Sequence, residues 1–128
     1  MHVHLPVLSP ASTVREAVDK MDIYQFPALV IVNENRQPLA VITEDRLAEA
    51  VKSRSLHQLS SAPAIEFAQR SPRVASVNDD VEECLRLMVE EDIKLLPVVA
   101  DQRLMGVALR VDLMQALLTA LASPSTED

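Results

Sequence analysis

The sequence contains one structural pattern twice, and this internal repeat limits the folds that the chain can adopt. Two segments carry apolar residues at helical spacing, and each residue of the first has a counterpart 67 positions later in the second. The first set is Val14, Ala17, Val18 and Met21, and the second set is Val81, Cys84, Leu85 and Met88. Thr13 with Glu16, and Asp80 with Glu83, are spaced as capping boxes, so a helix is predicted to begin at each place.

The same elements are predicted to follow each of these helices. Residues 26–32 (FPALVIV) match residues 96–100 (LPVVA) when their prolines are aligned, which is an offset of 70. A polar turn and a second strand come next, at 39–43 in one copy and at 104–109 in the other. Closing helices are expected at 47–51 and at 113–117, an offset of 66. The unit is therefore helix, strand, strand, helix, preceded by a short extended segment.

The repeat predicts an α+β fold, with residues 1–128 forming one α/β sandwich-like module. Repeat one is placed at about 5–52, a polar, serine-rich linker at about 53–70, and repeat two at about 71–122. Units of this length lie near the lower limit for a self-sufficient core, and two strands alone are marginally stable. We therefore expect the two pseudo-symmetric repeats to pack sheet to sheet.

Composition excludes several classes of function. The only glycine, Gly106, cannot supply either common glycine-rich phosphate loop. A formal charge of −7 disfavours nucleic acid and anionic lipid as partners, because both require a basic surface. The chain has no apolar run near the ~18 residues of a spanning helix and no visible signal peptide, which predicts no membrane insertion and a cytoplasmic location. A single cysteine, Cys84, agrees with a reducing compartment and is interpreted as a small core residue.

The doubled order of elements resembles a tandem pair of cystathionine β-synthase (CBS) domains, a Bateman module. Residues 7–21 are similar to the family's usual entry into its first helix: a hydrophobic segment, Ser-Pro, and a helix ending in Met. Residues 74–88 form the second copy of this entry. The resemblance implies a non-catalytic regulatory module that binds AMP, ADP, ATP or S-adenosylmethionine between its repeats and signals to a partner protein. It also implies a homodimer, and no required cofactor or metal.

The family's ligand signature, Gly-h-h-(Thr/Ser)-x-x-Asp, is incomplete in both copies. Residues 40–46 keep Thr43 but have Arg46 at the acidic position, and residues 106–112 keep Asp112 but have Leu109 at the hydroxyl position. The resemblance implies that Asp112 contacts ribose and Arg110 contacts phosphate. The other ligand-binding candidates that it implies are Leu96, Pro97, Val74 and Ala75 around the second cleft, and Thr43, Phe26 and Pro27 in the first copy.

Simpler interpretations stay open beside these. Asp112 could be the N-cap of its helix, Thr43 a capping hydroxyl, and Arg110 a solvated surface residue. The segment 79–92 carries seven acidic residues and one arginine, a net charge of −6, and is either a solvated face or a docking surface for a basic partner. Because no arrangement of nucleophile and base is visible, no enzymatic activity is predicted. The alternative function is a dimerisation or interaction scaffold of the same fold that has lost its ligand.

Overall fold

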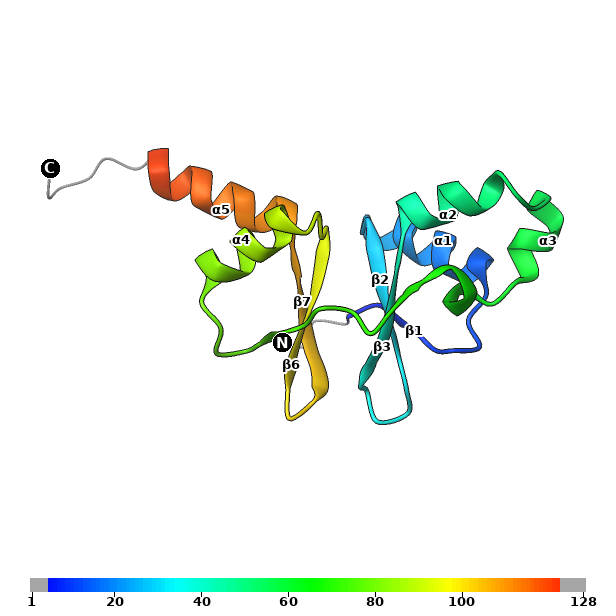
Figure 1. The fold of residues 1–128 in the computed structure, drawn as a ribbon, viewed down its shortest axis with the longest axis horizontal. Helices are drawn as coiled ribbons and strands as arrows, with labels where there is room; N and C mark the ends of the chain where they lie inside the picture. The colour runs from blue at the N-terminus through cyan, green and yellow to red at the C-terminus, as the bar shows by residue number, and fades with distance from the viewer. Residues whose placement is uncertain (1–4, 123–128) are drawn as a thin grey trace, which may run out of the picture.

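The structure is a computed structural model that describes residues 5–122, and it contains the predicted unit twice (Figure 1). The first unit consists of β1 (Val7–Leu8), α1 (Val14–Tyr24), β2 (Ala28–Val32), β3 (Pro38–Thr43) and α2 (Glu44–Val51). The second consists of β5 (Ala75–Ser76), α4 (Val81–Glu90), β6 (Leu95–Ala100), β7 (Arg103–Leu109) and α5 (Arg110–Ala122). In each unit the short first strand pairs in parallel with the next strand, which forms an antiparallel hairpin with the third. The predicted α+β fold class is confirmed.

The segment between the units is more ordered than its polar composition predicts. It forms α3 (Leu56–Ser61), a 3₁₀ helix η1 (Ala64–Phe67) and β4 (Gln69–Arg70). The Ser55 side chain caps α3 by accepting a hydrogen bond of 3.2 Å from the backbone N–H of Gln58. Leu59 is buried in the core of the first unit, and β4 extends the first sheet to the order β1-β2-β3-β4. The second sheet is β5-β6-β7, so within residues 5–122 the first unit receives both a helix and a strand that have no counterpart in the second unit.

Strand pairing shows that the offset of 67 between the repeats extends from the first helix to the end of the first hairpin strand. Ala28 pairs with Thr43 in one hairpin, and Leu95 pairs with Leu109 in the other. The backbone N–H of Phe26 donates to the carbonyl of Met21 (3.1 Å), and its counterpart 67 residues later makes the same bond to Met88 (2.8 Å). The structural equivalents of Phe26 and Pro27 are therefore Ile93 and Lys94.

The predicted match of Phe26-Pro27 with Leu96-Pro97 at an offset of 70 is wrong. Pro97 lies inside β6, opposite Val107, and is equivalent to Val30 in the centre of β2. The shared proline misled the alignment because the two prolines have different roles. Pro27 precedes a strand, whereas Pro97 occupies a buried position within one.

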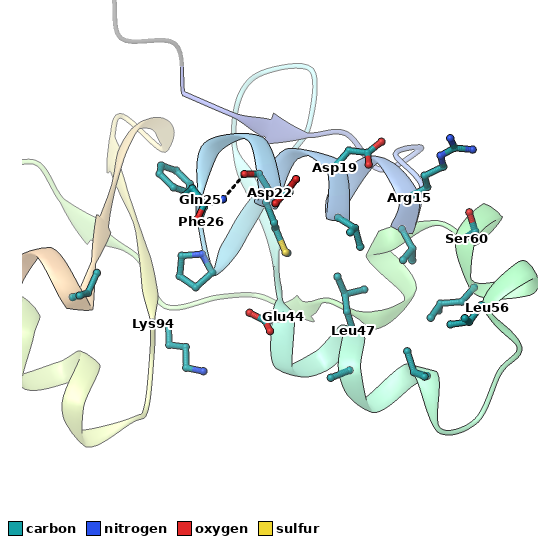
Figure 2. Close-up of a pocket in the computed structure, with 18 of the residues that line it drawn as sticks. Arg15, Asp19, Asp22, Gln25, Phe26, Glu44, Leu47, Leu56, Ser60 and Lys94 are labelled. Carbon is teal, nitrogen blue, oxygen red and sulfur yellow. Dashed lines mark hydrogen bonds between the residues drawn. The ribbon is translucent and has the colours of Figure 1, made fainter.

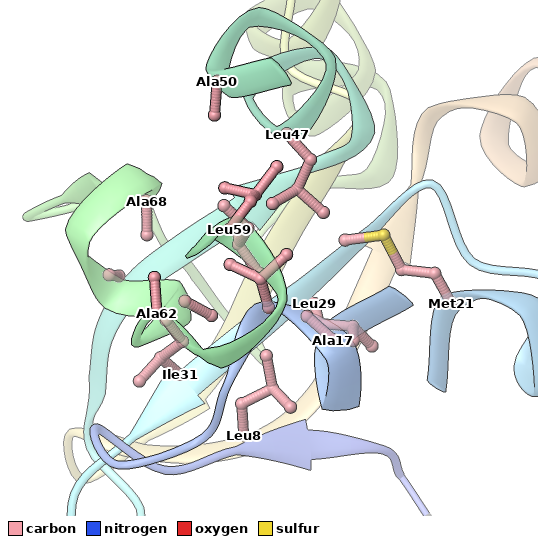
Figure 3. Packing of buried hydrophobic residues seen from close by; sticks show 14 residues of the cluster. Leu8, Ala17, Met21, Leu29, Ile31, Leu47, Ala50, Leu59, Ala62 and Ala68 are labelled. Atoms are coloured by element: carbon pink, nitrogen blue, oxygen red, sulfur yellow. The ribbon is translucent and has the colours of Figure 1, made fainter. Parts of the chain in front are cut away.

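Apolar side chains form three layers. Leu29 and Ile31 of β2 point toward α1, α2 and α3 (Figure 3). Ala28, Val30 and Val32 point to the opposite face and pack against the second sheet, because side chains alternate along a strand. A third and smaller cluster lies between the second sheet and its helices, and its buried members are Ala75, Met88 and Leu96. The two units therefore share one apolar layer between their sheets, as expected.

The helix ends bear out most of the predicted caps. Thr13 and Glu16 form the full capping box of α1, and the Asp80 carboxylate accepts from the backbone N–H of Glu83 (3.1 Å) to cap α4. For α4 only this half of the predicted box is present. No helix within residues 5–122 is long and apolar enough to span a membrane.

The β6–β7 turn supplies a stability prediction. Asp101 and Gln102 link the strands with φ angles of 50° and 67°, so both central residues of this two-residue turn adopt the left-handed region. Gln102→Gly should raise the free energy of unfolding by about 0.5–1 kcal/mol, because glycine adopts positive φ without steric strain. Urea unfolding measures the change. Gln102→Ala is the control, since it removes the same Gln37–Gln102 side-chain hydrogen bond but keeps a β-carbon at the positive φ of residue 102. Equal stability of Gln102→Gly and the wild type would show that the turn is unstrained.

Candidate functional site

In the part of the chain that the structure describes, a large and a small cleft lie at the boundary between the units. The large cleft is an open cavity of about 980 Å³ that runs between α1, α2 and α3 and ends at the second unit (Figure 2). At that end it is lined by Gln25, Phe26, Pro27, Lys94, Arg110 and Val111. The small cleft, of about 230 Å³, lies where Thr43, Asp45 and Arg46 of the first unit face the second unit.

Each cleft combines the residues that precede the first hairpin strand of one unit with residues at the start of the closing helix of the other unit. Phe26 and Pro27, which precede β2, face Arg110 and Val111 at the start of α5. The residues that precede β6 in turn lie with Thr43 and the start of α2 in the small cleft. Matching backbone hydrogen bonds join the start of the first hairpin strand to the closing helix within each unit, from Glu44 N–H to the Pro27 carbonyl (3.1 Å) and from Arg110 N–H to the Lys94 carbonyl (3.0 Å). The clefts are therefore related by the pseudo-symmetry of the repeat.

Lys94 lines both clefts and was missed by the sequence reasoning. Its ammonium Nζ donates to the Asp45 carboxylate across the unit boundary, at 2.6 Å. This hydrogen bond raises the pKa of Lys94 above its ordinary value, so the side chain is a cation at neutral pH. If the offset of 67 found for the helices is also applied to the strands, Lys94 aligns with Pro27. That alignment places Lys94 at the boundary between the two units.

Arg110 is the second cation at the inner end of the large cleft. Its guanidinium donates from Nη1 to the Asp92 carboxylate at 3.0 Å, and its side chain is 29% exposed. Asp92 follows α4 with a left-handed φ of 53°, as Gln25 follows α1 with a φ of 57°. Both cations at the inner end of the large cleft are thus held by carboxylates that an incoming anion would have to replace.

The structure does not bring the remaining second-copy candidates into either cleft. Leu96, Pro97 and Ala75 are buried inside the second unit, and Val74 is exposed elsewhere. Asp112 is exposed and lines neither cleft. Its alternative role as an N-cap is wrong, because α5 begins at Arg110 and Asp112 is its third residue.

Thr43 caps α2 and also lines the small cleft. Its hydroxyl Oγ1 accepts a hydrogen bond of 3.2 Å from the backbone N–H of Arg46, as the capping interpretation predicts. The structural equivalent of Thr43 is Leu109, which has no polar atom in its side chain to cap α5. The hydroxyl that the family signature requires is therefore available only in the small cleft.

Charges in the small cleft are largely paired. Arg73 and Glu91 form a two-pronged ion pair, with Nε and Oε1 3.0 Å apart, and this interaction lowers the pKa of Glu91. Arg46, Arg73 and Lys94 face the carboxylates of Asp45, Glu91 and Asp92. The small cleft therefore offers an anion no excess of positive charge. The same balance holds over the whole large cleft, where Asp19, Asp22 and Glu44 accompany its three cations, but Lys94 and Arg110 lie together at its inner end.

Cys84 carries no sign of reactivity. Burial, followed by the nearby Asp79 and Asp80 carboxylates, raises the pKa of its thiol, and this disfavours the nucleophilic thiolate. Across residues 5–122, no group of three or more His, Cys, Asp or Glu side chains could hold a metal ion.

The duplicated fold agrees with the relatives of the chain. The family model for the CBS domain matches twice, at residues 1–53 and 64–119. The chain belongs to the CBS-domain family. Its predicted resemblance to a tandem CBS pair is thereby confirmed.

Similar proteins share this architecture. An uncharacterized protein from Methanopyrus kandleri is 34% identical over 110 residues, which cover 84% of this chain. The match spans 55% of that protein, so the chain corresponds to about half of its length. The crystal structure of a CBS-domain-containing protein from Agrobacterium tumefaciens has a TM-score of 0.80 at 18% identity and covers 89% of this chain and 90% of its own. CBSX2, solved in complex with AMP, has a TM-score of 0.74 at 22% identity, covering 91% of this chain and 90% of its own. These likenesses establish the CBS-pair fold.

Proposed function

We propose that this CBS pair is a non-catalytic regulatory module that binds an adenine nucleotide at the inner end of the large cleft. The observation that carries the proposal is the meeting of an apolar wall and two cations there. Phe26 and Pro27 supply the wall, and Lys94 and Arg110 supply the cations. CBSX2, which binds AMP, supports the assignment of ligand class because it has the same fold.

The large cleft suits such a ligand in size and chemistry. Small-molecule sites in proteins measure roughly 300–1,000 Å³ and combine mostly apolar walls with a few polar groups. The large cleft lies within this range, whereas the small cleft, at about 230 Å³, lies below it. A phosphate would displace Asp92 from Arg110 and Asp45 from Lys94, exchanging one charge-assisted hydrogen bond for another.

Other parts of the proposal rest on the family and on composition. We propose a homodimer that signals to an effector protein still to be identified, in the cytoplasm. S-adenosylmethionine is the alternative ligand, since it shares the adenosine group with the nucleotides. No cofactor is required in this account.

A second function is favoured by one observation. Neither cleft combines a Thr or Ser hydroxyl with an acid at the signature positions, since Arg46 and Leu109 replace them. A CBS-fold scaffold that has lost its ligand would show this pattern while keeping its contacts with other chains.

A thermal-shift panel separates the two functions. AMP, ADP, ATP and S-adenosylmethionine are each added up to millimolar concentration, with adenosine and inorganic phosphate as the separate halves of the ligand. A bound ligand at 100 times its Kd stabilises the native state by about 2.7 kcal/mol. In a domain of this size that raises Tm by on the order of 10 °C. A shift with at least one of the four ligands, larger than with either half, supports the regulatory module. An unchanged Tm with all of them would favour the scaffold.

A further inference from the structure

Carboxylates flank the two cations at the inner end of the large cleft. On the side of the small cleft, Lys94 Nζ donates to Asp45 at 2.6 Å and Arg110 Nη1 donates to Asp92 at 3.0 Å. Both carboxylates line the small cleft and neither lines the large one. The carboxylates are exposed, whereas the cations are half-buried. Negative charge therefore already lies behind the cation pair, Lys94 and Arg110.

Two further carboxylates lie on the side of the large cleft. Glu44 is the first residue of α2, and its backbone N–H donates to the carbonyl of Pro27, which places it near the inner end. Asp22 lies in the last turn of α1. Both line the cavity, and in the described part of the chain neither side-chain carboxylate has a hydrogen bond or an ion pair. Figure 2 shows them between Lys94 at one end of the cavity and Arg15 at the other.

We propose that Asp22 and Glu44 are specificity-determining residues that limit the large cleft to a ligand with one phosphate group. The inference rests on the nucleotide function proposed above and names the member of that ligand class, a nucleoside monophosphate. One phosphate can bind both members of the cation pair through charge-assisted hydrogen bonds. A second or third phosphate on the same ligand then has no cation left at the inner end.

The places next to the cation pair are beside carboxylates on both sides. If the phosphate nearest the ribose binds the cations, the added phosphates of ADP or ATP lie on the side of Asp45 and Asp92. If the terminal phosphate binds them, the other phosphates lie beside Asp22 and Glu44. Like charges repel in both arrangements, so each added phosphate should weaken binding. Selectivity of this kind comes from repulsion of the wrong ligand rather than from new contacts with the right one.

The third cation of the cavity does not offset this repulsion. Arg15 lies at the start of α1, and Asp19, one helical turn later, also lines the cavity. A phosphate chain that begins at Lys94 must pass Asp22 and Glu44 before it reaches Arg15 (Figure 2). The order of charge along the cleft is therefore positive, negative and positive, which suits one phosphate at the inner end.

Calorimetric titration of the full chain with AMP, ADP and ATP tests this limit. The titrations contain EDTA, so that no divalent cation neutralises the phosphates. We expect AMP to bind roughly tenfold or more tightly than ATP, with ADP between them, because the added phosphates meet like charge. The ratio of the ATP and AMP dissociation constants should fall as salt is added, since ions screen the repulsion between exposed charges.

Two charge-removing variants identify the residues responsible. Glu44→Gln and Asp22→Asn keep the size of each side chain, and both positions are exposed, so the fold should be retained. Each variant should reduce the ATP-to-AMP ratio of dissociation constants by roughly threefold or more, because one repelling charge is gone. Glu49→Gln is the matched control, since Glu49 lies on the same helix as Glu44 but is exposed outside both clefts. It should leave the ratio unchanged.

The outcomes separate this inference from the proposed function. ATP binding as tight as AMP binding would overturn the one-phosphate limit and leave nucleotide binding in place. A preference for AMP that neither variant reduces, or that Glu49→Gln reduces equally, would contradict the role of Asp22 and Glu44. If none of the three nucleotides binds, the proposed function is wrong and this inference fails with it.

Discussion

Replacing Leu96 by alanine should lower the free energy of unfolding by about 3 kcal/mol. Leu96 is fully buried against Ala75 and Met88, and removal of a buried leucine side chain typically costs 2–5 kcal/mol through lost transfer energy and the cavity left behind. Six partly buried apolar side chains also pack against this cluster, so the truncation removes contacts at the centre of the second unit's core.

Urea unfolding of the variant measures this effect and tests the register of the repeat. Met105→Ala in the adjacent strand β7 is the matched control, because Met105 is 62% exposed and its truncation should cost less than about 0.5 kcal/mol. If Leu96 instead faced a ligand cleft, as the offset of 70 predicts, the two variants would have similar stabilities. Similar stabilities would contradict the offset of 67.

The doubled fold could be predicted from sequence because its signals are local. Helical periodicity at positions 14–21 and 81–88 marks both first helices, and short-range capping pairs mark where they begin. The sheet-to-sheet packing follows from physical need, since two strands and their apolar face are not stable alone.

The site could be predicted only in part, because it depends on how strands pair between distant residues. The apolar pattern of the helices aligns the two repeats at an offset of 67, whereas the prolines at 27 and 97 favour an offset of 70. Only the hydrogen-bonded register of the strands decides between these two alignments. This error placed Leu96 and Pro97 in a cleft and left Lys94 unnoticed. Helix α3 was not predicted because its segment has the polar, serine-rich composition of a linker. Its capping serine and the burial of Leu59 become evident only when the segment packs on the first unit.

Replacing Arg110 by alanine should weaken AMP binding by roughly 10- to 100-fold. A hydrogen bond to a charged group contributes about 1.5–3 kcal/mol, and each 1.4 kcal/mol changes affinity tenfold. The fold should be retained, because Asp92, the ion-pair partner of Arg110, is 83% exposed, and ion pairs that water reaches contribute little to stability. Arg103→Ala is the control, since Arg103 is an exposed arginine outside both clefts.

Replacing Asp92 by asparagine should act in the opposite direction. The change removes the carboxylate that now pairs with Arg110 and that would repel a phosphate. Asparagine tolerates the left-handed backbone at this position, so the loop should keep its shape. Tighter AMP binding by Asp92→Asn would show that Arg110 acts on the ligand through its charge rather than through packing.

The most direct test of the account is calorimetric titration of the folded wild-type chain with AMP, repeated for Arg110→Ala and Asp92→Asn. We predict saturable binding by the wild type, weaker binding by Arg110→Ala and tighter binding by Asp92→Asn. Wild-type chain that stays folded but takes up no AMP at millimolar concentration would contradict the nucleotide-binding claim. Equal affinity of the wild type and Arg110→Ala would place the ligand outside the large cleft.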